Sequence, residues 1–137
     1  MGLYLCVFCD DEELEGVEVG SYADFERFRN CVTEYLEQGS PGRRFPTLMN
    51  HADSHGEWTP AECETLKAEL AEIAAGLRQL PPAPFAADWQ QEVANSLGLE
   101  LKSLDESFID VDGEPLLERL EQLCDIAIQR QCPILFQ

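Results

Sequence analysis

Positive charge is scarce in this sequence. It holds nine Lys and Arg residues against 27 Asp and Glu residues, and its formal net charge at pH 7 is −18. Such a surface repels nucleic acid phosphates and anionic lipids, which argues against a protein that binds nucleic acid or membranes. It attracts cationic partners and raises their association rate, so a basic protein partner is favoured. The alternative is that the negative charge only keeps a small protein soluble.

Long apolar runs are lacking as well. No stretch approaches the run of about 18 apolar residues that a membrane-spanning helix needs. The apolar segment at residues 1–8 has no basic leader and no small-residue cleavage site before the first acids. This pattern indicates a β-strand rather than a signal peptide, and we expect a cytoplasmic location.

Nucleotide-binding and nucleophile motifs are missing, and histidine occurs only twice. His51, Asp53 and His55 could share a metal ion if their segment were helical, because both rings would then lie on one face. The neighbouring Asp, Ser and Gly residues favour an exposed loop instead. We therefore expect no enzyme activity, no metal ion and no cofactor. A small metal-dependent enzyme that uses these three residues is the less favoured alternative.

Six cysteines are present, but nothing in the sequence indicates secretion, so their even number does not by itself indicate disulfides. Cys6 and Cys9 form a Cys-x-x-Cys motif on an expected strand. A spacing of three residues on a strand points the two side chains to opposite faces, which is the wrong geometry for binding one metal ion together. Cys31, Cys63 and Cys124 lie on the apolar stripes of expected helices. We expect buried, unreactive thiols that behave as small apolar side chains.

A chain of 137 residues with 45% hydrophobic residues suits one domain with a proper core. The expected strands cover residues 1–8, 14–19, 43–50 (as an extended piece), 108–111 and 132–136. The expected helices begin at the caps Ser21 and Thr59, near Phe85, and after the Asp112-Gly113 turn. This order predicts an α+β fold in which a small mixed β-sheet is flanked by about four helices, as a single domain over residues 1–137.

Two acidic regions are candidate partner-binding surfaces. The first is the expected hairpin, whose like charges repel each other unless a cationic partner relieves them. Its candidate residues are Asp10, Asp11, Glu12, Glu13, Glu15 and Glu18. The second region is a loop with Asp53, Glu57 and Trp58, where an exposed tryptophan would suit an interface anchor. The alternatives are an acidic edge that discourages strand aggregation and a tryptophan that packs beside the following helix cap.

Several stretches resemble bacterial proteins of the immunity protein 70 family. They are Val-Gly-Ser at residues 19–21, Tyr-Leu-Glu at 35–37, Gly-Arg-Arg-Phe-Pro-Thr-Leu-Met-Asn at 42–50, and Asp-Gly-Glu-x-Leu at 112–116. The loop at residues 51–58 departs from that pattern, and loops are where partner specificity tends to lie.

The resemblance implies an immunity protein of a bacterial polymorphic toxin system. Such a protein binds a cognate toxin in the cytoplasm and blocks it, and it has no catalytic residues. Toxin domains that are nucleases present a basic cleft to phosphate, so a chain with a net charge of −18 would match such a cleft. The alternative is a non-catalytic regulatory interaction module whose partner is encoded elsewhere. Oligomeric state does not follow from the sequence.

Overall fold

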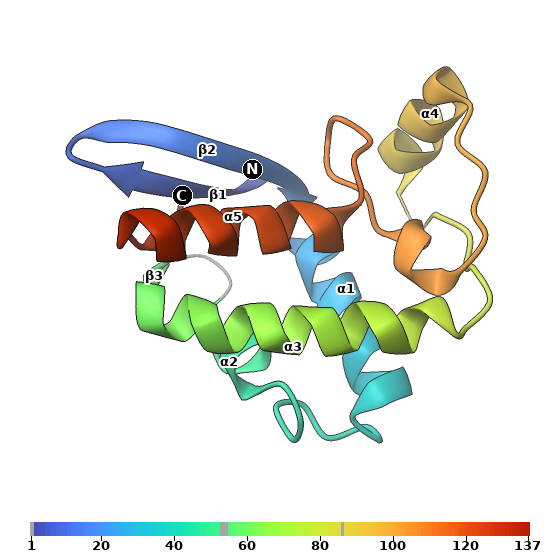
Figure 1. The fold of residues 1–137 in the computed structure, drawn as a ribbon. Helices are drawn as coiled ribbons and strands as arrows, with labels where there is room; N and C mark the ends of the chain where they lie inside the picture. Colours follow the sequence, from blue (N-terminus) through green and yellow to red (C-terminus); the bar gives the residue numbers. More distant parts are fainter. Residues whose placement is uncertain (1, 53–54, 86) are drawn as a thin grey trace.

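The computed structural model describes residues 2–52, 55–85 and 87–137 (Figure 1). Over these residues the strands are β1 (Gly2–Cys9), β2 (Glu12–Ser21), β3 (Glu57–Trp58) and β4 (Ile134–Phe136). The α-helices are α1 (Tyr22–Leu36), α2 (Pro46–Met49), α3 (Pro60–Arg78), α4 (Asp88–Leu97) and α5 (Leu116–Arg130), with a 3-10 turn at Leu104–Ser107. The α+β class expected from the sequence is confirmed.

The four strands form one sheet in the order β2-β1-β4-β3. A mixed sheet was expected, and this detail is wrong: all strand pairings in the described residues are antiparallel. The last strand, β4, enters between β1 and β3, which places the first and last segments of the chain side by side. Figure 1 shows α5 running beside the sheet, with α3 beyond it on the same side, whereas α4 stands apart past the end of the strands.

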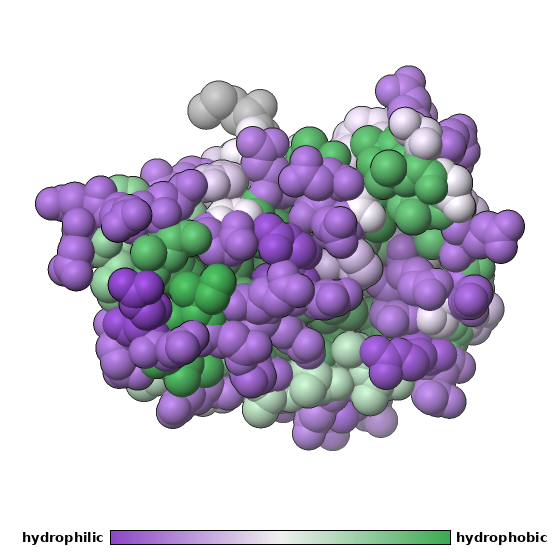
Figure 2. Space-filling model, turned by 45° about the horizontal axis from the view of Figure 1, so that its top comes forward, coloured by the Kyte–Doolittle hydropathy of each residue, from purple (hydrophilic) through white to green (hydrophobic). Residues whose placement is uncertain are grey.

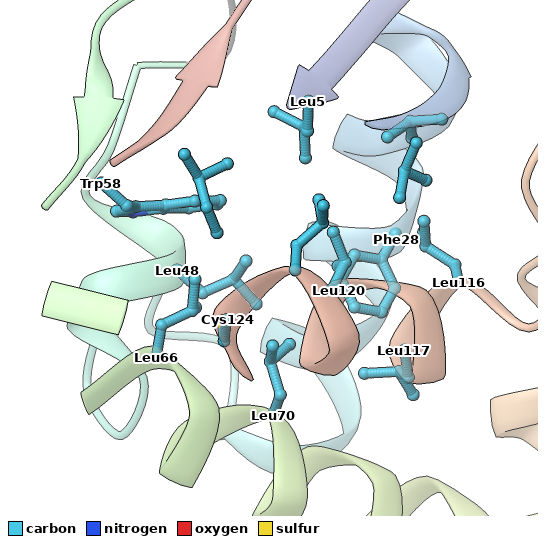
Figure 3. Close-up of a cluster of buried hydrophobic side chains, with 14 of the residues drawn as sticks. Leu5, Phe28, Leu48, Trp58, Leu66, Leu70, Leu116, Leu117, Leu120 and Cys124 are labelled. Atoms are coloured by element: carbon cyan, nitrogen blue, oxygen red, sulfur yellow. The ribbon is translucent and has the colours of Figure 1, made fainter. Parts of the chain in front are cut away.

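The hydrophobic core lies between the sheet and these helices. Alternate residues of β1, namely Leu3, Leu5 and Val7, are at most 1% exposed and belong to the core. Phe28 of α1 and Leu120 of α5 belong to the same core, as Figure 3 shows. The alternation follows from strand geometry, because successive side chains point to opposite faces of a sheet.

Two helix starts match the sequence pattern closely. The Ser21 side chain accepts a hydrogen bond from the Asp24 amide, and the Asp24 carboxylate accepts one from the Ser21 amide. Thr59 and Glu62 form the same reciprocal pair at the start of α3. Each capping box satisfies amides that the first helical turn leaves without partners.

Residues 43–50 differ from the extended piece that the sequence led us to expect. They turn into the short helix α2, Pro46–Met49, with proline at its first turn. The amides of Thr47 and Leu48 donate hydrogen bonds to the buried Glu69 carboxylate on α3, at 3.1 and 3.0 Å. A carboxylate at a helix N-terminus satisfies amides that would otherwise lack partners, and this stabilises a helix too short to form alone.

Glu37, the residue that follows the last turn of α1, fixes the residues that lead into α2. Its side chain is fully buried, and one carboxylate oxygen accepts hydrogen bonds from the amides of Arg44 at 3.0 Å and Phe45 at 3.1 Å. The other oxygen accepts a hydrogen bond from the Thr33 hydroxyl at 3.1 Å. Through these hydrogen bonds, Glu37 joins the end of α1 to the Arg-Phe-Pro stretch at residues 44–46, and the two segments form one structural unit.

The strand expected at residues 108–111 is also replaced by a turn. Only Ile109 pairs there, in an isolated bridge with Pro115. The buried Asp110 carboxylate accepts hydrogen bonds from the amides of Asp112 and Glu114, both at 2.9 Å. An aspartate that bonds amides two and four residues ahead bends the backbone and competes with a strand ladder.

Cys9 and Cys132 form a disulfide, which corrects the expectation that all six cysteines are free thiols. Cys9 ends β1 and Cys132 precedes β4. These two strands are antiparallel neighbours, so the two cysteines meet with their Cα atoms 5.7 Å apart. This separation is the usual one for a disulfide. Cys6, Cys31, Cys63 and Cys124 are free, and of these only Cys31 is partly exposed.

Candidate partner-binding site

The acidic hairpin turns at Asp10 and Asp11, between β1 and β2. Both residues have positive φ angles, 52° and 62°. A two-residue hairpin turn of this kind needs left-handed backbone at both positions, and aspartate tolerates it better than most side chains. The turn therefore projects two carboxylates from the tip of the sheet.

The six hairpin acids do not share one environment. Asp10, Asp11, Glu12, Glu13 and Glu18 are exposed. Glu15 is only partly exposed, and its carboxylate lies 3.5 Å from the Arg119 guanidinium of α5. The structure therefore leaves five of these acids exposed and pairs the sixth, Glu15, with an arginine of the same molecule.

No lysine or arginine precedes Arg27 in the chain, although residues 10–26 contain eight acids. Arg119 reaches β2 from α5, where it also donates a hydrogen bond to the Gly16 carbonyl at 3.0 Å. In the described residues, no ion pair involves Asp10, Asp11 or Glu13. The hairpin tip thus keeps an uncompensated negative field.

The residues of the second candidate region, Asp53, Glu57 and Trp58, do not form one surface. Asp53 lies outside the described residues. Glu57 is exposed on β3, at the opposite edge of the sheet from β2. Three strand spacings separate the two edges, or about 14 Å. The structure therefore places Glu57 and the hairpin acids on one sheet, but not in one contiguous cluster.

Trp58 is not the exposed anchor that its acidic surroundings suggested. It is 1% exposed and points into the core (Figure 3). Its indole nitrogen donates a hydrogen bond to the Thr47 carbonyl at 3.1 Å, and its ring packs edge-on against Phe136. The Cys63 thiol, one turn into α3, donates to the Trp58 carbonyl at 3.8 Å. Trp58 thus packs beside the helix cap, the alternative that the sequence left open.

The histidines do not assemble a metal site in the described part of the chain. Both ring nitrogens of His51 face backbone carbonyls, those of Ala52 at 2.6 Å and Glu57 at 2.9 Å. The same ring stacks on Phe136 with centroids 4.2 Å apart. His51 therefore fastens the loop to the sheet edge, which is a structural role.

The molecular surface is mainly hydrophilic on the face shown in Figure 2, with green patches between the polar residues. One patch lies at the upper right, where Figure 1 places α4. Leu97 of α4 and the following Leu99 are 56% and 38% exposed. Within the described ranges, no helix is long and apolar enough to span a membrane.

Taken together, the fold and the exposed carboxylates define a small acidic α+β protein whose surface chemistry suits contacts with another protein. Comparison with protein families gives the particular group. The family model described as Immunity protein 70 matches residues 3–136, so the chain belongs to the immunity protein 70 family. No curated protein matches the chain, and no solved structure does.

Proposed function

We propose that this chain is a cytoplasmic immunity protein that binds and neutralises a cognate bacterial toxin domain. Membership of the immunity protein 70 family supports the general role. The observation that supports the binding mode is the hairpin tip, where Asp10 to Glu13 are exposed and, among the described residues, form no ion pair. The chain acts by binding, without a metal ion, a cofactor or catalysis.

The expected partner is basic. A toxin domain that acts on nucleic acid presents a positively charged cleft, and a −18 protein can occupy such a cleft in place of phosphates. Complementary charge also accelerates encounter, which suits an inhibitor that must bind before its toxin acts. Neither nucleic acid nor a membrane is expected to bind the chain itself.

Co-expression tests the function directly. The gene next to that of this chain is expressed alone and together with it, and growth and co-purification are followed. A toxic neighbour whose effect disappears in the presence of this chain, and which elutes with it, supports the proposal. A harmless neighbour with no co-elution contradicts it.

Removing the hairpin charge should slow association with the toxin. The variant replaces Asp10 and Asp11 by Asn and replaces Glu12 and Glu13 by Gln. Asparagine suits left-handed turn positions, so the hairpin should persist. We expect the association rate to fall roughly tenfold at low salt, and less at high salt where charges are screened. Stopped-flow or surface-based kinetics at two salt concentrations measure this change.

A charge-matched control separates the hairpin from the net charge. Four exposed acids elsewhere are changed to Gln, at Glu64, Glu92, Glu100 and Glu118. The control should keep most of the wild-type association rate. Equal slowing in both variants would mean that only the overall charge matters, and unchanged kinetics in the hairpin variant would remove the hairpin from the interface.

A further inference from the structure

The outer face of the sheet, turned away from the helices, carries apolar side chains. Tyr4, Cys6 and Phe8 alternate with the core residues of β1, and Cys6 pairs with Leu135 of β4 in the sheet register. These side chains surround a shallow hollow of about 180 Å³, to which no helix contributes. Its lining residues are Tyr4, Cys6, Phe8, Glu13, Leu135 and Gln137.

This face is apolar at its centre and open to solvent. The Phe8 side chain is 39% exposed, which is high for a phenylalanine on a central strand. Tyr4 and Leu135 are partly exposed, and Cys6 is covered by its neighbours. An antiparallel sheet with one solvated face normally shows polar residues there, so the two-sided apolar pattern of β1 needs another explanation.

The tyrosine on this face is held in place. A side chain at position 16 would overlap the Tyr4 hydroxyl, so Gly16 makes room for the ring on β2. Burial and the hydrogen-bonded Glu13 carboxylate raise the pKa of Tyr4 to about 12. The ring thus lies over Gly16, and Tyr4 and Glu13 both border the hollow. A surface fixed in this way loses little side-chain entropy on binding.

Carboxylates frame the apolar centre on both edges. Glu13 and Glu18 on β2 are opposite Phe8 and Tyr4, and Glu57 on β3 is opposite Leu135. All three acids are exposed, and in the described ranges none of the three is in an ion pair. The four strands contain no lysine or arginine.

We propose that this outer sheet face is where the basic partner docks, with an apolar side chain in the hollow beside Phe8 and Lys or Arg residues against Glu13, Glu18 and Glu57. The inference rests on the proposed immunity function and assigns it a surface. An apolar centre inside a charged rim is the usual anatomy of a specific interface. A second copy of this chain fits poorly, because it would bring the same acidic rim against itself.

The first test truncates the apolar centre. The probe is a catalytically inactive form of the toxin encoded beside this chain's gene. Phe8→Ala should weaken its binding at least about tenfold, mainly through faster dissociation, because buried aromatic anchors dominate interface affinity. Tyr35→Ala is the matched control, since Tyr35 is an exposed aromatic residue on α1. It should bind within about twofold of wild type. Equal melting temperatures show that both variants are folded.

The second test removes the rim charge. The triple variant Glu13→Gln, Glu18→Gln and Glu57→Gln should slow association roughly five- to tenfold at low salt. Its control makes the same change in net charge at Glu64, Glu92 and Glu100, and should associate at nearly the wild-type rate.

The outcomes separate this inference from the proposed function. If wild-type protein binds the toxin and both the Phe8 and the rim variants bind equally well, the sheet face is wrong and the immunity function stands. A loss of binding with Tyr35→Ala but not with Phe8→Ala would likewise overturn the sheet face and move the interface to α1. If wild-type protein neither binds nor neutralises the toxin, both proposals fail.

Discussion

Replacing Glu37 by alanine is expected to lower the free energy of unfolding by about 3 to 5 kcal/mol. The fully buried carboxylate accepts hydrogen bonds from two backbone amides, those of Arg44 and Phe45, and from the Thr33 hydroxyl. Alanine would remove the acceptor and leave a buried amide at Phe45 without its partner. The loss should appear in urea denaturation as a lower midpoint with a similar slope.

Two further variants show whether these hydrogen bonds are the cause. Glu37→Gln keeps one oxygen acceptor and should lose less, about 1 to 2 kcal/mol. Glu34→Ala alters an exposed glutamate on the same helix and should change stability by no more than about 0.5 kcal/mol. A loss below about 1 kcal/mol for Glu37→Ala would mean that water satisfies the freed amides, and that the unit at residues 43–50 does not depend on Glu37.

The segment at residues 43–50 also shows which helices could not be predicted from the sequence. The Ser21 and Thr59 caps were predictable because each capping box is contained within four consecutive residues. The helix at Pro46–Met49 was missed because its N-terminal amides are satisfied by Glu69, more than twenty residues away. A distant acceptor leaves no local sequence signal.

For the sheet, too, local features were predictable from the sequence and contacts between distant residues were not. The first strand was expected from its apolar run and the second from its alternation, on either side of an acidic turn, and the structure pairs them as a hairpin with a shorter turn, Asp10 and Asp11 alone. Strand order was not predictable, because the insertion of β4 beside β1 depends on contacts more than a hundred residues apart. The Cys9–Cys132 disulfide was missed for the same reason, since those cysteines meet only once β4 is placed.

Prediction of the candidate site was also partial. Charge alone identified the hairpin acids, and five of the six are exposed. Trp58 was misjudged because acidic neighbours in sequence do not decide which face of a strand a side chain takes; its pairing with Ile134 turns it inward. The outer sheet face was missed, although the uninterrupted apolar residues of β1 were its sequence signal.

Asp24 is expected to hold α4 against the rest of the protein. Its buried carboxylate accepts hydrogen bonds from the Ser21 amide at 2.7 Å, the Trp89 indole at 3.1 Å and the Arg27 guanidinium at 2.9 Å. Trp89 belongs to α4, which stands apart from α3 and α5 in Figure 1. Replacing Asp24 by alanine removes the carboxylate half of the capping box and this tie together, although Ser21 keeps its own cap bond to the amide of residue 24, and should lower stability by about 3 kcal/mol at pH 7.

The pH dependence of this loss tests the charge of Asp24. Burial would raise the pKa of Asp24, but hydrogen bonds from Ser21, Trp89 and Arg27 outweigh burial and hold the pKa below its usual value. A carboxyl group whose pKa is lower in the folded state stabilises the protein above its unfolded pKa, about 3.9 for aspartate. That contribution disappears as the pH falls through the lower folded pKa. The stability gap between wild type and Asp24→Asn should therefore be widest near neutral pH and shrink below about pH 4.

Urea titrations of wild type and Asp24→Asn from pH 7 down to pH 2.5 measure this gap. The difference between the two proteins cancels the titration of the many other carboxylates, which dominates the acid response of each protein alone. Asp88→Asn is the control, because Asp88 is exposed at the start of α4 and its replacement should change stability less than Asp24→Asn at pH 7. A gap for Asp24→Asn that stays constant with pH would show that its contribution comes from the shape and hydrogen bonds of the side chain, and that the carboxylate charge is not what ties α4 to α1.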